Sequence, residues 1–412
     1  MNIVVDVDRT ITELEELAKF SDAEPPGVTR IVFTPADVRA RQWLKEKFSE
    51  AELSVREDAV GNTFARWEGT EPDLPAIGTG SHIDAIPNSG RYDGTVGVLG
   101  GLEAIRALQK AGYRPRKSIE LLLFTSEEPT RFGLGCLGSR LLSGVLSPED
   151  AADLRDSGGS TLESVRSAAG FEGALNTVQF PQAYYDGFIE LHIEQGPALE
   201  REGIALGVVT EIAAPASLRI VVEGEGGHAG AVLMPQRRDA LTAAAELILS
   251  VESAALSTGV MDTVATTGIC DVFPGAVNSV PSRVKLEIDV RDVEQERRNV
   301  VLSLIEQASQ TVANKRGVSV RSELLNADAP AACARFIIES LMQTCAAQGF
   351  THKPMISRAY HDSLFMARIA PVGMLFIPCR EGVSHRPDEY ASPESIASGV
   401  RVLAHALARL AA

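Results

Sequence analysis

The segment SIELLLFTSEEP, residues 118–129, joins an almost continuously apolar run to two adjacent acids. Such a run is typical of a strand in a sheet that helices cover on both faces. Ligands of open α/β sheets bind beyond the carboxyl ends of the strands, which is where Glu127 and Glu128 lie. Because neighbouring side chains of an extended chain point to opposite sides, we expect these two acids to have different roles. The alternative is an acid pair at a solvated strand end.

Residues 76–94, AIGTGSHIDAIPNSGRYDG, show a similar arrangement of a short strand followed by polar residues. The letters AIGTG form the predicted buried strand, and His82 and Asp84 follow it. Their side chains face the same side of an extended chain, so one could bind a metal while the other orients it or the adjacent base. Asp93, next to Gly94, could approach a metal closely and bridge two ions. The alternative is a polar loop with an Asn-Ser-Gly turn.

Two further histidines complete a set of metal-binding residue types. His192 lies in FIELHIEQGPALE and would share a strand face with Glu190, although a buried core histidine is the alternative. His385, in EGVSHRPDEY, follows a predicted strand, and a loop histidine is the alternative. Imidazole and carboxylate ligands suit a hydrolytic Zn²⁺ or Mn²⁺ site, and a two-metal hydrolase also needs a bridging carboxylate and a free base. The candidates are His82, Asp93, Glu128, His192 and His385 as ligands and Glu127 as base.

The predicted elements divide the chain into three stretches. Residues 1–213 alternate strands and helices, and this pattern resumes over residues 326–412, which favours an α/β domain. Residues 214–325 instead follow the order β-α-β-β-α-β of a ferredoxin-like unit and would form an inserted α+β domain. The first domain is therefore split, and His385 must return to complete a site that begins at His82.

The inserted stretch carries candidate residues of its own. His228 lies in GEGGHAG, whose glycines permit close approach of a ligand, and it could donate a hydrogen bond to an oxyanion. Asn278 and Arg291 could recognise a carboxylate, which arginine does bidentately. The alternative for Arg291 is an ordinary surface salt bridge. Beyond the insertion, His361 in SRAYHDS could lie behind the metal ligands, contact the substrate or be structural.

Composition excludes some classes of partner and location. The chain has 412 residues and a net charge of −16, which disfavours nucleic acid or an anionic membrane as a partner. Its five cysteines form no CxxC pair and are typical of reduced thiols in a cytoplasmic protein. The N-terminus lacks the basic and apolar regions of a secretory signal. No apolar stretch approaches the roughly 18 residues of a transmembrane helix.

Six segments together resemble the dimetal aminopeptidase, carboxypeptidase and acylase clan, and within it the amidohydrolases of N-carbamoyl and ureido compounds. They span nearly the whole chain: GSHIDAIPNSGRYDG, TSEEPTRFG, ELHIEQGPALE, GGHAG, NSVPSRVKLEIDVRD and SHRPDEY. The resemblance implies a mixed sheet covered by helices and two divalent ions per subunit, Mn²⁺ or Zn²⁺. It also implies that His82 and His192 are ligands, that Asp93 bridges, that Glu128 and His385 bind the second ion, and that Glu127 is the general base.

The same resemblance implies a homodimer. The insertion would be a lid and dimerisation domain that brings His228 to the partner's site, and Gln195, Asn278 and Arg291 match substrate-binding positions. Most members carry SGAGHDA where this chain has SRAYHDS. The bulky Tyr360 in that segment should reshape the substrate pocket beside His361.

The segments EEPTRFG and SRAYHDSLFMA resemble most closely those of ureidoglycolate amidohydrolases. This implies hydrolysis of the ureido C–N bond of a small carboxylate, with release of ammonia. N-carbamoyl-L-amino acids and allantoate are alternative substrates, and a metallopeptidase or deacylase is a more distant alternative. A nucleotide-binding protein that uses GTVGVLGG, residues 94–101, is disfavoured because the chain there has neither GxGxxG nor GxxxxGK[ST]; these glycines favour close helix packing.

Overall fold

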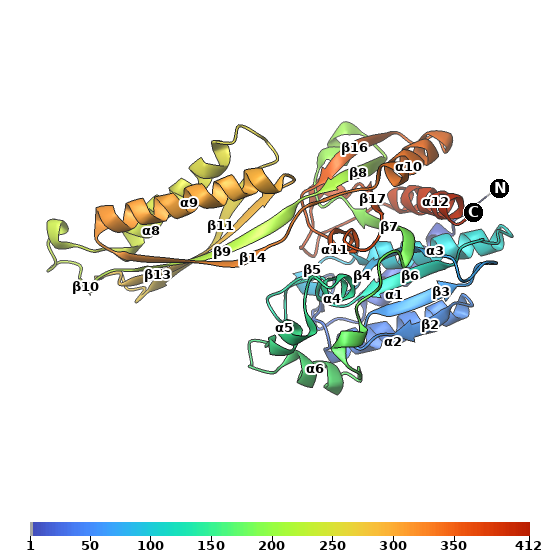
Figure 1. The fold of residues 1–412 in the computed structure, drawn as a ribbon, viewed down its shortest axis with the longest axis horizontal. Coiled ribbons are helices and arrows are strands. Elements are labelled where there is room, and N and C mark those ends of the chain that lie inside the picture. The colour runs from blue at the N-terminus through green and yellow to red at the C-terminus, as the bar shows by residue number, and fades with distance from the viewer. Residues whose placement is uncertain (1–2) are drawn as a thin grey trace. The chain divides into compact units, whose positions relative to one another are not determined.

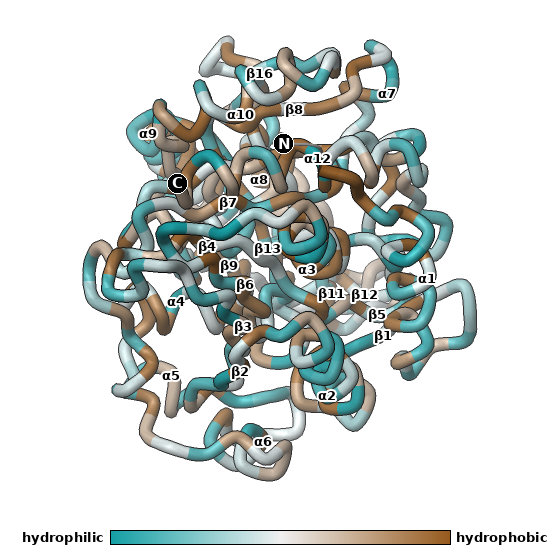
Figure 2. Tube along the Cα trace, turned by 90° about the vertical axis from the view of Figure 1, so that its right-hand side faces the viewer, coloured by the Kyte–Doolittle hydropathy of each residue, from teal (hydrophilic) through white to brown (hydrophobic). Residues whose placement is uncertain are grey.

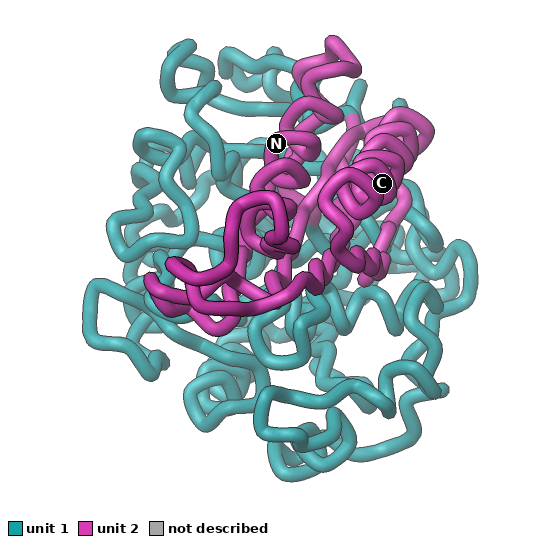
Figure 3. Tube along the Cα trace, turned by 90° about the vertical axis from the view of Figure 1, so that its left-hand side faces the viewer, with its two compact units in different colours: residues 1–210, 332–357, 361–412 teal, residues 211–331, 358–360 magenta. Residues whose placement is uncertain are grey.

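The computed structural model describes residues 3–412, which form two compact units (Figure 3). Unit 1 comprises residues 1–210, 332–357 and 361–412, and unit 2 comprises residues 211–331 and 358–360. The boundaries therefore lie a few residues from those expected. None of the described helices has the length and apolar character needed to cross a membrane.

A short segment beyond the inserted stretch groups with unit 2. Residues 358–360 lie within the stretch 326–412 of the sequence but make their contacts in unit 2. The reason is a set of contacts that sequence does not reveal: Arg358 forms a 2.6 Å ion pair with Asp262, and its carbonyl accepts a hydrogen bond from Arg291. The Arg291 guanidinium also lies over the Tyr360 ring.

Figure 1 labels the elements in chain order. The strands that lie wholly or mostly in unit 1 are β1 (Val28–Arg30), β2 (Ser54–Glu57), β3 (Thr63–Trp67), β4 (Ala76–His82), β5 (Ala85–Ser89), β6 (Ile119–Phe124), β7 (Tyr185–Ile193), β8 (Leu206–Ile212), β15 (Ala331–Ala332), β16 (His352–Ser357) and β17 (Val372–Ile377). Its helices are α1 (Val7–Ala18), α2 (Pro35–Glu50), α3 (Thr95–Lys110), α4 (Leu137–Ser143), α5 (Pro148–Asp153), α6 (Leu162–Ala168), α7 (Ala198–Glu202), α10 (Arg335–Ala347), α11 (Asp362–Met366) and α12 (Pro393–Leu410).

The main sheet of unit 1 has the order β15-β8-β17-β7-β4-β6-β3-β2, with β16 paired to β8. The central strands β17, β7, β4 and β6 are parallel neighbours, whereas β8, β3 and β2 pair antiparallel to the strands beside them. The expected mixed α/β architecture is therefore confirmed. Strand β6 is buried along its whole length and stands out as hydrophobic in Figure 2, in agreement with its apolar sequence.

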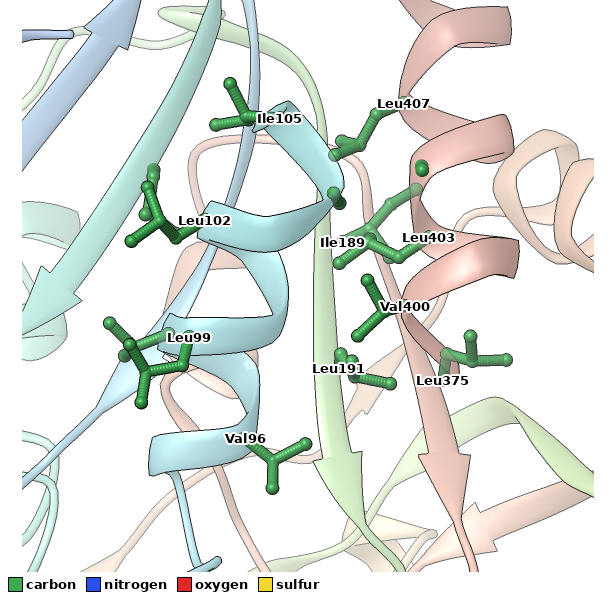
Figure 4. Packing of buried hydrophobic residues seen from close by; sticks show 14 of the residues in the cluster. Val96, Leu99, Leu102, Ile105, Ile189, Leu191, Leu375, Val400, Leu403 and Leu407 are labelled. Carbon is green, nitrogen blue, oxygen red and sulfur yellow. The ribbon is translucent and has the colours of Figure 1, made fainter. Parts of the chain in front are cut away.

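The core of unit 1 lies between the sheet and the helices α3 and α12. Figure 4 shows Val400 and Leu403 of α12 beside Ile189 and Leu191 of β7, while Leu99 and Leu102 extend from the other side of α3. The alternation along β7 turns Ile189 and Leu191 toward the helices. The residues between and after them, Glu190 and His192, therefore face the opposite side of the sheet. One strand thus serves both the hydrophobic core and a polar site.

The glycines of α3 allow this helix to pack closely on the sheet. A Cβ atom at Gly97 would lie 2.5 Å from the Leu191 carbonyl oxygen and 2.6 Å from the Ser81 Cβ. A Cβ at Gly101 would lie 2.7 Å from the Leu121 side chain. These distances are too short for non-bonded atoms, so the glycines are explained by packing, as predicted, rather than by a phosphate loop.

Unit 2 is an antiparallel sheet of order β11-β13-β9-β14, packed against two helices. Its elements are β9 (Ala214–Glu223), β10 (Gly227–His228), α8 (Ala240–Leu256), β11 (Val264–Phe273), β12 (Ser279–Val280), β13 (Arg283–Asp292), α9 (Gln295–Arg316) and β14 (Ser319–Ala327). Apart from the short β10 and β12, this is the predicted β-α-β-β-α-β connectivity. Helix α8 begins at Ala240, where the Asp239 side chain caps it by accepting hydrogen bonds from Leu241 N and Thr242 N.

Candidate metal centre

The predicted metal ligands converge at one edge of the main sheet. His82 ends β4, Glu128 follows β6, and His192 lies near the end of β7. These three strands are parallel neighbours, so their carboxyl ends meet at the same edge. Asp93 comes from the loop before α3, and His385 comes from the loop after β17. The chain thus brings together residues that are far apart in sequence.

The Asp93 carboxylate lies at the centre of this group. Its Oδ1 is 3.3 Å from His192 Nε2 and 3.8 Å from His82 Nε2. Its Oδ2 is 3.1 Å from His385 Nε2, and that same nitrogen is 3.3 Å from Glu128 Oε1. The two oxygens of one carboxylate therefore face two different sets of ligands.

These contacts define two groups of potential metal ligands. His82, Asp93 and His192 offer ligand atoms within 4.8 Å of one another, and so do Asp93, Glu128 and His385. Each group combines imidazole nitrogen with carboxylate oxygen, a donor set that fits Zn²⁺ or Mn²⁺. Asp93 is common to both, which is the arrangement that a bridging carboxylate requires.

Gly94 makes room for the His82 ring. This glycine has φ of 66°, and a Cβ atom added to it would lie 2.4 Å from His82 Nε2. That nitrogen is the atom that faces Asp93. A larger residue at position 94 would therefore displace the ring or the carboxylate, and the Asp-Gly pair seen in the sequence is explained by close packing.

Asp84 orients its neighbours from behind the ligands. Its carboxylate accepts hydrogen bonds from the backbone N–H groups of Glu127, at 3.1 Å, and Glu128, at 2.9 Å. His82 Nδ1 lies 3.0 Å from the Asp84 carbonyl oxygen, so a proton on Nδ1 leaves the Nε2 lone pair directed into the site. Asp84 thus holds the backbone of Glu127 and Glu128 in place, and its carbonyl oxygen favours the His82 tautomer with the proton on Nδ1.

Glu127 is set apart from the ligand groups and faces them. Its Oε2 lies 3.7 Å from His82 Nε2, and the Cys136 thiol lies 3.7 Å from its Oε1. Burial raises the pKa of Glu127 well above its ordinary value, the positive charge of His82 opposes this, and Glu128 reinforces it. A buried carboxyl with an elevated pKa can accept a proton and hold it, as a general base must.

The protonation of the ligand side chains reflects their mutual contacts. Burial would raise the pKa of Asp93, but hydrogen bonds with His192 and His385 hold it well below its usual range. Hydrogen bonds with Asp93 and Glu128 raise the pKa of His385 to about 11. Without a metal, protonated imidazoles therefore balance the negative charge of the carboxylates in this cluster. A bound divalent cation could supply that positive charge in place of the protons.

Two predicted substrate-binding residues of unit 1 lie beside the ligands. Gln195 donates hydrogen bonds to Asp93 Oδ2 at 2.9 Å and to Ser384 Oγ at 3.2 Å. The His361 ring lies 4.4 Å from the His192 ring, and both are buried. Both residues therefore contact metal-ligand candidates directly, and His361 lies behind His192.

Unit 2 holds the remaining predicted residues, in two separate pairs. The residue after His228, Ala229, donates a backbone hydrogen bond to the Asn278 carbonyl, so these two sites adjoin. The Arg291 guanidinium lies 5.8 Å from the centre of the Tyr360 ring and pairs with Asp289 at 2.7 Å.

The two pairs lie at opposite ends of β13. Residues 283–291 of this strand separate Asn278 from Arg291 by about 25 Å at the usual rise per residue. Asn278 and Arg291 of one chain are therefore too far apart to contact the same carboxylate, and their assignment as substrate-binding residues stays a prediction.

Several buried polar residues near the site were not among the predictions. Glu389 accepts hydrogen bonds from Tyr92 N and Asp93 N, and burial raises its pKa to about 7. Glu190 accepts hydrogen bonds from Ser81 and Ser363. The alternation of side chains along the strand places Glu190 on the same face as His192 and could have indicated its position. No local pattern in SHRPDEY distinguishes Glu389 from an ordinary loop acid.

Left-handed backbone recurs next to the ligands. Ser126, Gln195 and His385 have φ of 56°, 54° and 58°, values that residues other than glycine adopt rarely. Ser126 precedes Glu127, Gln195 lies three residues after His192, and His385 is itself a ligand candidate. Strained backbone of this kind persists where surrounding contacts impose it and is concentrated at functional sites.

Residues 78–409 match the peptidase family M20/M25/M40. The chain belongs to this family. It is 52% identical, over 416 aligned residues, to the ureidoglycolate hydrolase of Arabidopsis thaliana, covering 99% of this chain and 87% of that protein. It is 39% identical to the N-carbamoyl-L-amino-acid amidohydrolase of Paenarthrobacter aurescens, covering 96% of each. The predicted relationship to these amidohydrolases, and with it the expectation of a hydrolase, is confirmed.

Solved structures agree with this relationship. The crystal structure of AtUAH in complex with glyoxylate matches with a TM-score of 0.92 and 51% identity, covering 99% of this chain and 98% of that one. The high TM-score and the near-complete coverage of both chains show that the two proteins share the same fold.

Divalent metal binding is expected to release protons from the histidines. Because the pKa of His385 is raised to about 11, its ring is protonated near neutral pH and must lose that proton to bind a metal. The affinity for Mn²⁺ should therefore rise between about pH 6 and 8, by up to about tenfold per pH unit for each proton released. Chelator competition on metal-stripped protein would measure this slope, which should be shallower in His385→Asn. An affinity independent of pH would contradict the assignment.

Proposed function

We propose that the protein is a two-metal amidohydrolase that cleaves the ureido C–N bond of a small carboxylate, with ureidoglycolate as its substrate. The observation that carries the reaction is the Asp93 carboxylate, which two ligand groups share beside a separate buried acid, Glu127. The substrate choice is supported by the higher identity to a ureidoglycolate hydrolase, 52%, than to an N-carbamoyl-L-amino-acid amidohydrolase, 39%.

We assign the two ions, Mn²⁺ or Zn²⁺, to the two ligand groups. His82 and His192 would hold one, Glu128 and His385 the other, and Asp93 would bridge them. When bound, such ions supply Lewis acidity toward the substrate carbonyl and lower the pKa of a coordinated water. Affinity alone would favour zinc over manganese, so the native metal depends on availability as well as on the donors.

Glu127 is the proposed general base. It would take a proton from the attacking water and return it to the departing nitrogen. Water adds to the ureido carbonyl, the bond to the terminal nitrogen breaks, and ammonia leaves with that proton. The organic product is an unstable carbamate. Asp84 and Cys136 support this role, because one anchors the Glu127 backbone and the other contacts its Oε1.

We propose that the active site is completed by two chains of a homodimer, with unit 2 as lid and dimerisation domain. Arg291 and Tyr360 would hold the substrate carboxylate on one subunit, while His228 and Asn278 would reach the partner's site and stabilise the oxyanion. The separation of these pairs along β13 supports this division, because one chain cannot bring all four to one ligand.

The surface around His228 supports a partner at that end of unit 2. Large apolar side chains there are exposed, including Leu233, Met234, Phe273 and Val277. Exposed apolar groups that gather in this way mark interaction sites. We also propose a cytoplasmic location, which the scattered set of five cysteines without a CxxC pair supports, because reducing compartments preserve thiols.

Ammonia release by metal-stripped protein, re-supplied with Mn²⁺ or Zn²⁺, tests the reaction. We expect turnover of ureidoglycolate to exceed that of allantoate, β-ureidopropionate and N-carbamoyl-L-amino acids. Glu127→Gln should lose at least about 100-fold in kcat while binding the metal as the parent does, because it removes the base but no ligand. Faster turnover of an N-carbamoyl-L-amino acid would change the substrate, and release of amino acids from dipeptides would favour a peptidase.

Mixing two inactive variants tests the shared site. His228→Ala and Glu127→Gln proteins should each be inactive alone, for lack of the oxyanion donor and the base respectively. After unfolding and refolding together, a heterodimer contains one site with both residues intact, so about a quarter of the parent activity should return. Mixtures that stay inactive, although mixed dimers form, would place His228 outside the partner's site.

A further inference from the structure

Glu389 is a buried carboxylate whose position neither ligates a proposed metal nor contacts the proposed base. It is 4% exposed and follows His385 by four residues in SHRPDEY. We infer that Glu389 is a positioning residue that fixes two metal ligands, Asp93 and His385, relative to each other. This inference rests on the proposed metal centre and adds to it a residue that acts through the ligands.

One oxygen of Glu389 holds the loop that carries Asp93. Its Oε1 accepts a hydrogen bond from the Tyr92 N–H at 2.8 Å and another from the Asp93 N–H at 3.1 Å. Both bonds are buried, so no water can replace the acceptor without entering the site. Two adjacent backbone donors on one oxygen fix the position of the Asp93 backbone.

The other oxygen of Glu389 holds the loop that carries His385. Its Oε2 lies 3.0 Å from Ser384 Oγ, and Ser384 immediately precedes His385. The same hydroxyl lies 3.2 Å from Asp93 Oδ2. Glu389 therefore joins two loops whose residues Asp93 and Ser384 are 291 positions apart in the chain, at the point where the Asp93 carboxylate meets the His385 ring.

Gly90 reserves the space that Glu389 fills. A Cβ atom at Gly90 would lie 2.3 Å from both the Cβ and the Oε1 of Glu389. The backbone of Gly90 does not adopt a left-handed conformation, so its φ angle does not by itself require glycine at this position. Its lack of a side chain is thus required by Glu389, and Gly90→Ala offers a second way to displace the same carboxylate.

His385 depends on such an anchor more than the other ligands do. Its side chain is 47% exposed, whereas that of His192 is 1% exposed. It also comes from a loop, and its backbone has φ of 58°. Without the Glu389 link, the distance between His385 Nε2 and Asp93 Oδ2 would no longer be held at its observed 3.1 Å.

Affinity for Mn²⁺, measured by chelator competition, tests this inference together with kcat and KM. Removal of the anchor in Glu389→Ala, or its displacement in Gly90→Ala, should weaken binding of one of the two ions about 10- to 100-fold. Glu389→Gln should stay close to the parent, because its amide oxygen can accept both backbone bonds and its NH₂ can donate to Ser384. At saturating Mn²⁺, Glu389→Ala should lose kcat more than it raises KM.

Glu103→Ala is the matched control. Glu103 is also buried, at 1% exposure, and accepts hydrogen bonds from Asp6 N and from Arg9, but it lies within α3 and contacts none of the ligands. We expect this variant to lower thermal stability and leave Mn²⁺ affinity unchanged.

Three results would overturn the inference. If folded Glu389→Ala and Gly90→Ala both bind Mn²⁺ as tightly as the parent, Asp93 and His385 keep their positions without Glu389. A loss in Glu389→Gln as large as in Glu389→Ala would assign the effect to charge rather than to positioning; if Glu389→Ala does not fold, Gly90→Ala replaces it in this comparison. Equal losses in Glu103→Ala would reduce Glu389 to a general contributor to stability. Failure of the parent itself to bind Mn²⁺ would instead overturn the proposed metal centre.

Discussion

The dual role of the Asp93 carboxylate is the constraint on which the rest of unit 1 depends. Its Oδ1 faces the rings of His82 and His192, and its Oδ2 faces the ring of His385. Residues from three strand ends and two loops must therefore reach one point. The parallel order of β7, β4 and β6 provides the common edge, and the close packing of α3 on these strands places the loop that carries Asp93 above it.

Features that depend on local geometry could be predicted from sequence, and contacts between distant segments could not. The apolar run before Glu127 and the alternation around His192 indicate strands and the faces of their side chains. The spacing of Asp84 to His82 indicates that the two residues adjoin, but not that the Asp84 carboxylate would bind the backbone of Glu127 and Glu128. By contrast, Glu389 meets the Asp93 backbone across 296 residues, and no local pattern specifies that meeting.

Unit 2 illustrates the same distinction. Its connectivity followed from the order of predicted elements, but Asn278 and Arg291, close in sequence, lie at opposite ends of β13. Residues 358–360 adjoin His361 in the chain, yet their contacts with Asp262 and Arg291 place them in unit 2. The family resemblance implies roles for Asn278 and Arg291. The length of β13 indicates that these two residues of one chain cannot contact the same ligand.

Anomalous diffraction from crystals of the protein grown with Mn²⁺ tests the bridging role of Asp93 most directly. We expect two anomalous peaks beside the Asp93 carboxylate, about 3.5–4 Å apart, as in other two-metal sites. One peak should adjoin His82 and His192, and the other Glu128 and His385. A single peak bound by only one of these groups, or peaks that Asp93 does not touch, would contradict the bridging role.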